Sequence, residues 1–96
     1  MIEVRQTPEF ARWLRKLADP QALVRVVGRI RRMQQGNFGD VRSFGRGLME
    51  MRVDYGSGYR IYFVRGGELV VILLCGGDKR TQTKDIERAR NMAEKY

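Results

Sequence analysis

The chain has 96 residues, with 19 Lys and Arg against 11 Asp and Glu, so its formal net charge is +8. This length allows one domain with a modest core over residues 1–96, and the charge favours a polyanionic partner such as RNA, DNA or the ribosome over a merely soluble basic surface. With no histidine and only Cys75, the composition excludes an internal disulfide and a zinc centre, and we expect no metal or cofactor.

Membrane insertion and secretion are not expected. No apolar run approaches the roughly 18 residues that a membrane span requires. The first residues, MIEVRQTPEF, are charged from the third position and lack the apolar stretch of a signal peptide. The expected location is therefore cytoplasmic, with no membrane partner.

The first third of the chain predicts a strand followed by two helices. Residues 2–6 alternate apolar and charged side chains, which indicates a short strand. Thr7 and Pro8 are typical of an N-cap and a first helical position, and Asp19 with Pro20 repeats the pattern for a second helix. The first helix has an apolar stripe at helical spacing, made by Phe10, Trp13, Leu14 and Leu17.

In the second helix, one face is expected to be buried and another to be basic. Gly36 is a plausible C-cap. The basic face is either solvated or a contact for ribosomal RNA, and it carries Arg25, Arg29 and Arg32. The expected buried residues are Leu23, Val26, Val27, Ile30 and Met33.

From Leu48 the pattern changes to a period of two, after a loop at 36–47 that is rich in glycine and basic residues. Strands are expected at about 48–54 and 59–65, and Gly66-Gly67 suits a two-residue hairpin turn. The near-continuous apolar run 69–75 indicates a strand covered on both faces, between the third strand and the first, that ends at Gly76-Gly77.

The last helix is expected over 85–96, with an apolar side made by Ile86, Ala89 and Met92 or Ala93. The predicted order is β-α-α-β-β-β-α. This order corresponds to an α+β fold in which helices pack on a small, mostly antiparallel sheet.

Arginines occupy strand positions in this predicted sheet. If the turn after Asp54 is centred on Gly56, Arg52 lies opposite Arg60; if it is shifted by one pair, Arg52 faces Tyr62. In both registers the two arginines and Tyr62 share one face with Glu50. Like charges that face each other destabilise a sheet, whereas guanidinium groups bind phosphate through paired hydrogen bonds. The pattern therefore favours an anion site, and a surface ion network with Asp54 is the alternative.

The segment from Gly76 to Arg80 follows the central strand. Its glycines allow close approach of a ligand to the backbone, and Lys79 and Arg80 supply positive charge, although the motif alone also fits an ordinary glycine-rich loop. The spacing of a P-loop is absent.

Metal-independent cleavage of RNA needs a base for the 2′-hydroxyl, cations for the phosphate and an acid for the leaving oxygen. On the arginine face, Glu50 is the carboxylate nominated as base, with Tyr62 as a weaker candidate. Arg52 and Arg60 would bind phosphate, and Lys79 or Arg80 would stabilise or protonate the leaving group. These groups have reference pKa values far from neutrality, so we expect assisted rather than free-standing catalysis.

The run GYRIYFVRGGELVVILLCGGDKRTQTKDIERA, together with the upstream Leu-Met-Glu-Met-Arg strand, resembles the RelE/ParE toxins of bacterial type II toxin–antitoxin modules. The resemblance covers essentially the whole chain and is greatest to the HigB-like branch of addiction-module killer proteins. It implies a basic catalytic set of Arg52, Arg60 and Lys79 or Arg80. The late tyrosine and the histidines used by relatives are missing, so the acid and base stay open.

This resemblance implies a toxin neutralised by a cognate antitoxin, often a helix-turn-helix protein, with the pair binding its operator DNA. RelE and HigB toxins cut mRNA on the ribosome, whereas ParE toxins poison DNA gyrase without cleaving RNA, and the second activity is the alternative. Further RNA contacts are expected from basic residues outside the catalytic set: Arg42, Arg46, Lys84, Arg25 and Arg29.

Overall fold

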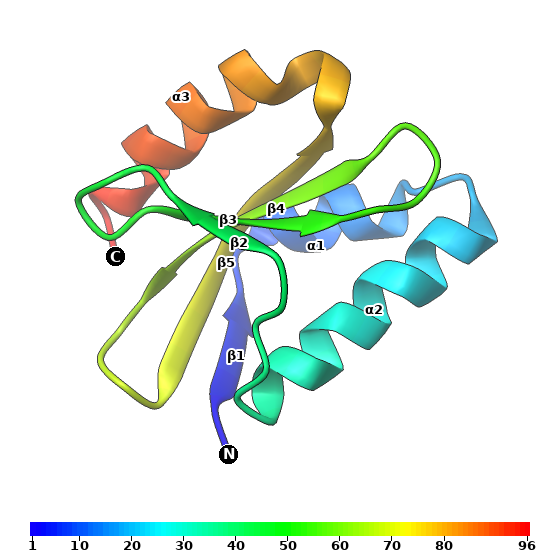
Figure 1. Ribbon diagram of the computed structural model, residues 1–96. Coiled ribbons are helices and arrows are strands. Elements are labelled where there is room, and N and C mark those ends of the chain that lie inside the picture. The colour runs from blue at the N-terminus through cyan, green and yellow to red at the C-terminus, as the bar shows by residue number, and fades with distance from the viewer.

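The protein folds as a five-stranded sheet with helices on both faces, as a computed structural model of residues 1–96 shows (Figure 1). This arrangement confirms the predicted α+β fold. In chain order the elements are β1 (Glu3–Gln6), α1 (Pro8–Arg15), α2 (Pro20–Gln34), β2 (Val41–Ser43), β3 (Met49–Val53), β4 (Tyr59–Arg65), β5 (Val70–Asp78), the 3-10 helix η1 (Lys79–Thr81) and α3 (Gln82–Ala93).

The strand order is β1-β5-β4-β3-β2, with β1 parallel to β5 and the other neighbours antiparallel. The apolar strand β5 therefore lies between β1 and β4, as its composition predicts. The short strand β2 was not predicted. It falls within the expected loop 36–47 and pairs with β3 at the edge of the sheet.

Two apolar cores flank the sheet, because α1 and α2 cover one face and α3 covers the other (Figure 1). In the first core, Phe10 and Val26 pack with Ile61 and Phe63 of β4. The second core lies under α3 and contains Leu48, Tyr62, Val64, Leu74, Cys75, Ala89 and Met92. Glu50 of β3 and Arg60, Tyr62 and Val64 of β4, which a two-layer sheet would expose, are therefore buried, whereas Arg52 stays exposed.

Both predicted N-caps are present. Thr7 Oγ1 accepts a hydrogen bond from the Phe10 N–H (3.1 Å) and donates one to the Leu74 carbonyl (2.5 Å), so the cap also fixes α1 to β5. Asp19 accepts from the Gln21 N–H at 2.9 Å. At the other end of α2, Gly36 has φ = 90°, the left-handed conformation expected of a residue that follows a helix.

Several local expectations were wrong. Leu23 is exposed, and Ala22 takes the core position one residue earlier on α2. The β4–β5 connection contains residues 66–69 rather than a two-residue turn, and Gly67 but not Gly66 has a positive φ. The last helix begins at Gln82, earlier than predicted, because η1 leads directly into it.

Gly76 and Gly77 do not end β5, which continues to Asp78. A Cβ on Gly76 would overlap the Trp13 ring, and a Cβ on Gly77 would overlap the Asp85 carboxylate. The lack of a side chain at these glycines therefore lets α1 pack on one face of the sheet and the start of α3 pack on the other. The space beside their backbone is filled by side chains of the protein itself. None of the helices has the length and apolar character needed to cross a membrane.

Candidate active site

The strand register is the first of the two that parity allows. Arg52 pairs directly with Arg60, and Glu50 pairs with Tyr62 one step along β3 and β4. Arg60 in turn lies beside Gly77 of β5. The predicted cluster is therefore real, and it lies on the face of the sheet that α3 covers.

A cavity of about 340 Å³ opens at the end of the sheet where β3 turns into β4 and β5 runs into η1. Three predicted cations, Arg52, Arg60 and Lys79, contribute to its wall. The remaining wall comes from the loop before β2 and from the hairpin: Asp40, Val53, Asp54, Gly56, Ser57, Gly58 and Tyr59. The cavity has both the positive charge to hold a phosphate and carboxylates able to accept a proton.

Arg52 forms an ion pair with Asp40. The distance from Arg52 Nε to Asp40 Oδ2 is 3.3 Å, and both side chains are about half exposed. The Arg52 N–H also donates to the Asp40 carbonyl at 2.9 Å. An exposed pair of this kind is weak, so an arriving phosphate can compete for the guanidinium.

Arg60 is held from behind by a buried carboxylate. Its Nε lies 3.6 Å from Glu50 Oε2, with the Arg60 side chain 11% exposed and Glu50 fully buried. The same carboxylate oxygen accepts a hydrogen bond from Gln82 Nε2 at 3.0 Å. Glu50 does not line the cavity. This position argues against Glu50 as the base, because a base must come within hydrogen-bond reach of the proton that it removes.

Tyr62 is also a poor base in this setting. Its hydroxyl is buried and has no hydrogen-bond partner. Burial, reinforced by the nearby Glu50 carboxylate, raises the pKa of Tyr62 far above its ordinary value. The phenolate that could accept a proton is therefore strongly disfavoured.

Lys79 and Arg80 differ in position although they are adjacent. Lys79 lines the cavity, whereas Arg80 is not part of its wall, is highly exposed, and pairs with Asp78 through Nη2 at 2.9 Å. Hydrogen bonds from the Arg80 side chain hold the pKa of Asp78 below its usual value. Of the two, Lys79 is the one placed to contact a ligand in the cavity.

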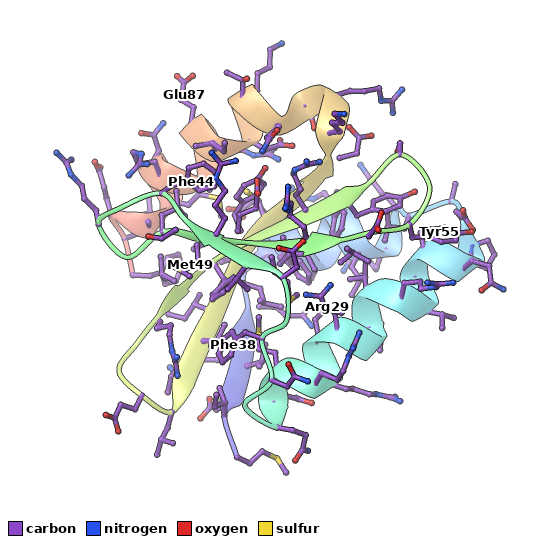
Figure 2. The ribbon with its side chains drawn as sticks, viewed as in Figure 1. Arg29, Phe38, Phe44, Met49, Tyr55 and Glu87 are labelled. Carbon is purple, nitrogen blue, oxygen red and sulfur yellow. The ribbon has the colours of Figure 1, made fainter.

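Two of the basic residues of α2, Arg25 and Arg29, contact other parts of the protein, whereas Arg32 is exposed. Arg29 points from α2 toward the strands (Figure 2), and its Nη1 and Nη2 donate to the carbonyls of Arg52 (2.5 Å) and Phe38 (3.1 Å). Burial, followed by the nearby Arg32, lowers the pKa of Arg29. The Arg25 guanidinium lies 5.0 Å from the centre of the Tyr55 ring. These contacts make Arg29 a structural residue and argue against its predicted RNA contact.

The other predicted RNA contacts lie outside the cavity. Arg42 stacks over Phe44 at 5.1 Å, and Lys84 is exposed in the first turn of α3. Arg46 has φ = 54° and lines a smaller hollow at the opposite end of β3 and β4, beside Met49. These residues are accessible but do not converge with Arg52, Arg60 and Lys79.

The sequence pattern does not single out Asp40 or Asp54 as proton acceptors, yet they are the carboxylates on the cavity wall. Asp54 was recognised only as a charge partner for the arginines. Asp40 comes near Arg52 through the pairing of β2 with β3, and the sequence contains no clear signal for β2. No group of three or more His, Cys, Asp and Glu side chains is arranged to hold a metal ion.

Comparison with known proteins gives three findings. Residues 12–94 match the model of a family described as phage derived protein Gp49-like (DUF891). An uncharacterized protein of Haemophilus influenzae is 46% identical over 93 residues, which are 97% of this chain and 94% of that protein. The fold is similar to a chain in the crystal structure of the toxin–antitoxin complex RelBE2 from Mycobacterium tuberculosis, with a TM-score of 0.56, 26% identity, and coverage of 81% of this chain and 98% of that one.

Proposed function

This chain belongs to the phage-derived Gp49-like family (DUF891), and we propose that it is the toxin of a type II toxin–antitoxin pair that cuts mRNA on the ribosome. The similarity to a chain of the RelBE2 toxin–antitoxin complex supports the toxin assignment. The resemblance of residues 58–89 to the HigB-like branch of these toxins supports a place in that branch. The proposed partners are a cognate antitoxin of the helix-turn-helix type, the ribosome with its mRNA, and operator DNA bound through the antitoxin complex.

The observation that carries the nuclease proposal is the convergence of Arg52, Arg60 and Lys79 on one cavity. Arginine pairs with phosphate oxygens through two parallel hydrogen bonds, and charge that develops on the phosphate is stabilised by such fixed donors. A surface that only needs to be soluble has no reason to place Arg52 opposite Arg60, because like charges facing each other are destabilising.

The proposed reaction needs no cofactor. A carboxylate on the cavity wall, Asp40 or Asp54, takes the proton of the 2′-hydroxyl, and the 2′-oxygen attacks the phosphorus. The bond from phosphorus to the 5′-oxygen breaks, and this oxygen receives a proton from the Lys79 ammonium. The products are a 2′,3′-cyclic phosphate and a free 5′-hydroxyl. Arg52 and Arg60 would stabilise the charge on the phosphate throughout.

The test is induced expression followed by mapping of mRNA 5′ ends. We expect translation to stop and new ends to appear within codons. Arg52→Ala and Lys79→Ala should remove the cuts, whereas Arg15→Ala on the exposed end of α1 changes the charge equally and should keep them. Arg60→Ala is a poor probe, since it would leave the buried Glu50 without its counter-charge. Arg60→Lys keeps the charge but loses the planar fork, so it should also reduce cleavage.

Intact transcripts under toxic expression would refute the nuclease. A gyrase poison would instead inhibit DNA supercoiling as a purified protein. In that case Arg52→Ala would still be toxic. For the antitoxin, we expect its binding to cover basic residues. The complex should therefore leave a cation exchanger at lower salt than the free toxin, and an unchanged elution position would contradict this masking.

A further inference from the structure

Three buried polar atoms without hydrogen-bond partners lie together behind the cavity. They are Glu50 Oε1, Arg60 Nε and the Tyr62 hydroxyl. Such atoms are uncommon in folded proteins, because each loses its hydration without gaining a partner. A buried ion pair is also weak evidence for stability, since apolar side chains of similar volume often serve as well. The cluster therefore calls for a role other than stability.

Given the proposed nuclease function, on which this inference rests, we propose that Glu50 and Gln82 are positioning residues that aim the Arg60 guanidinium into the cavity. In this role neither residue exchanges a proton with RNA. Glu50 would act through Arg60, and Gln82 would act through Glu50.

The geometry supports this chain of contacts. Glu50 comes from β3, Arg60 from β4, and Gln82 is the first residue of α3, so three elements meet at one carboxylate. Gln82 donates to Glu50 Oε2 at 3.0 Å, and this oxygen is the one that lies 3.6 Å from Arg60 Nε. Gln82 has no other role in the proposed reaction.

The two cavity arginines differ in how firmly they are held. Arg52 is 45% exposed and pairs with Asp40, which is itself exposed. Arg60 is 11% exposed and faces a fully buried carboxylate, while its side chain still contributes to the cavity wall. A donor held in place before the phosphate arrives needs little reorganisation during the reaction, and this is the condition under which electrostatic stabilisation is most effective.

The experiment measures single-turnover cleavage of mRNA on programmed ribosomes by purified toxin. Glu50→Gln keeps the size of the side chain and removes its charge. We expect it to reduce the rate by roughly 100-fold, as a small misplacement of a catalytic group does, without changing the shape of the pH–rate profile. In an Arg60→Lys background the same substitution should cost little more, because its effect passes through Arg60. Gln82→Ala should give a smaller loss of the same kind.

A second measurement does not depend on cleavage. The Nε–H of Arg60 should give a shifted, slowly exchanging NMR signal that moves in Glu50→Gln and in Gln82→Ala. Binding of a short RNA with 2′-deoxy residues, which cannot be cleaved, should weaken in the same two variants. If wild-type toxin does not cut mRNA, the nuclease proposal fails, and these two readouts still decide whether Glu50 positions Arg60.

Met92→Ala is the control for a general loss of stability, because it removes packing from the core under α3. This variant should melt earlier but cleave normally below its melting temperature. If Glu50→Gln does not fold, Gln82→Ala carries the same readouts. Loss of the acid limb of the pH profile in Glu50→Gln would overturn the inference in favour of a base. Full additivity with Arg60→Lys, or an unmoved Arg60 signal, would overturn it as well.

Discussion

The hydrogen-bond or ion-pair partner of each arginine determines whether that arginine can bind a ligand. Arg29 donates to two backbone carbonyls and is committed to the fold. Arg80 is paired with its neighbour Asp78 at the surface. Arg52 is only loosely held, by Asp40, and Arg60 faces the buried Glu50. In a chain this basic, the number of arginines says little about the site, whereas their counter-charges separate structural residues from ligand-binding ones.

Asp40 is predicted to oppose binding whether or not it serves catalysis. Asp40→Asn frees Arg52 and should tighten binding of an uncleavable RNA by roughly 1.5- to 5-fold, the range of an exposed ion pair. If Asp40 is also the base, cleavage should fall by about 10²- to 10⁴-fold in the same variant. Asp54→Asn is the comparison variant at the other carboxylate of the cavity, and the loss of cleavage should appear there instead if Asp54 is the base. Weaker binding by Asp40→Asn would contradict the competition between Asp40 and phosphate.

Asp78 predicts a pH dependence of stability. It accepts from the Arg80 N–H at the start of η1 and pairs with the Arg80 side chain, which lowers its pKa in the folded state. The stabilisation is therefore complete above the ordinary aspartate pKa of about 3.9 and is lost as the pH falls through the lower folded value. In urea titrations, Asp78→Asn should narrow the stability difference between neutral and acidic pH. An identical difference in wild type and variant would exclude this contribution.

At the scale of elements, the close packing of α1 and α3 against β5 determines where the cavity forms. Gly76 admits the Trp13 ring of α1, and Gly77 admits Thr81 and Asp85 at the start of α3. Because η1 and α3 are held tightly against β5, Lys79 is brought beside the β3–β4 hairpin. The glycine pair therefore contributes to the site through packing rather than through direct contact with a ligand.

Alanine substitutions at Gly77 and Gly28 should change the stability of the fold in opposite directions, because the two glycines have different surroundings. Gly77→Ala would place a methyl group on the Asp85 carboxylate and should destabilise the fold by about 1–3 kcal/mol or more. Gly28, inside α2, has nothing within 4 Å of its ideal Cβ, so Gly28→Ala should stabilise by about 0.5–1 kcal/mol. Chemical denaturation of both variants provides the test, and destabilisation by Gly28→Ala would show that the space at that helix face is needed.

Local rules in the sequence were enough to predict the caps, most elements and the shared face of the two arginines, whereas their direct pairing was one of two registers left open. Thr7 and Asp19 have the chemistry of an N-cap, and strand parity limits Arg52 and Arg60 to few registers. The burial of Glu50 could not be predicted in this way, because it depends on α3 covering the second face of the sheet. The role of Asp40 was missed for a similar reason, since it requires the short strand β2, which has no periodic pattern.

At the scale of the whole molecule, the excess positive charge is spread over the surface while the cavity occupies one end of the sheet. The net charge of +8 attracts any polyanion, but this general attraction is weakened by salt and carries no specificity. Specific binding should come from the few cations that contact phosphate directly. The two contributions can be separated because each cation that contacts a phosphate directly adds a fixed increment to the slope of log affinity against log salt concentration.

We therefore predict different salt dependences for two variants of equal charge. Lys79→Ala removes a cation of the cavity wall, and for a single-stranded RNA it should reduce the slope of log K against log salt by about 0.7. Arg15→Ala removes one exposed charge on α1, outside the cavity wall, and should leave the slope close to that of wild type. Fluorescence anisotropy with a labelled uncleavable RNA over a series of salt concentrations measures both slopes. Equal slopes for Lys79→Ala and wild type would place the bound RNA elsewhere on the basic surface, and the cavity would then have no part in RNA binding.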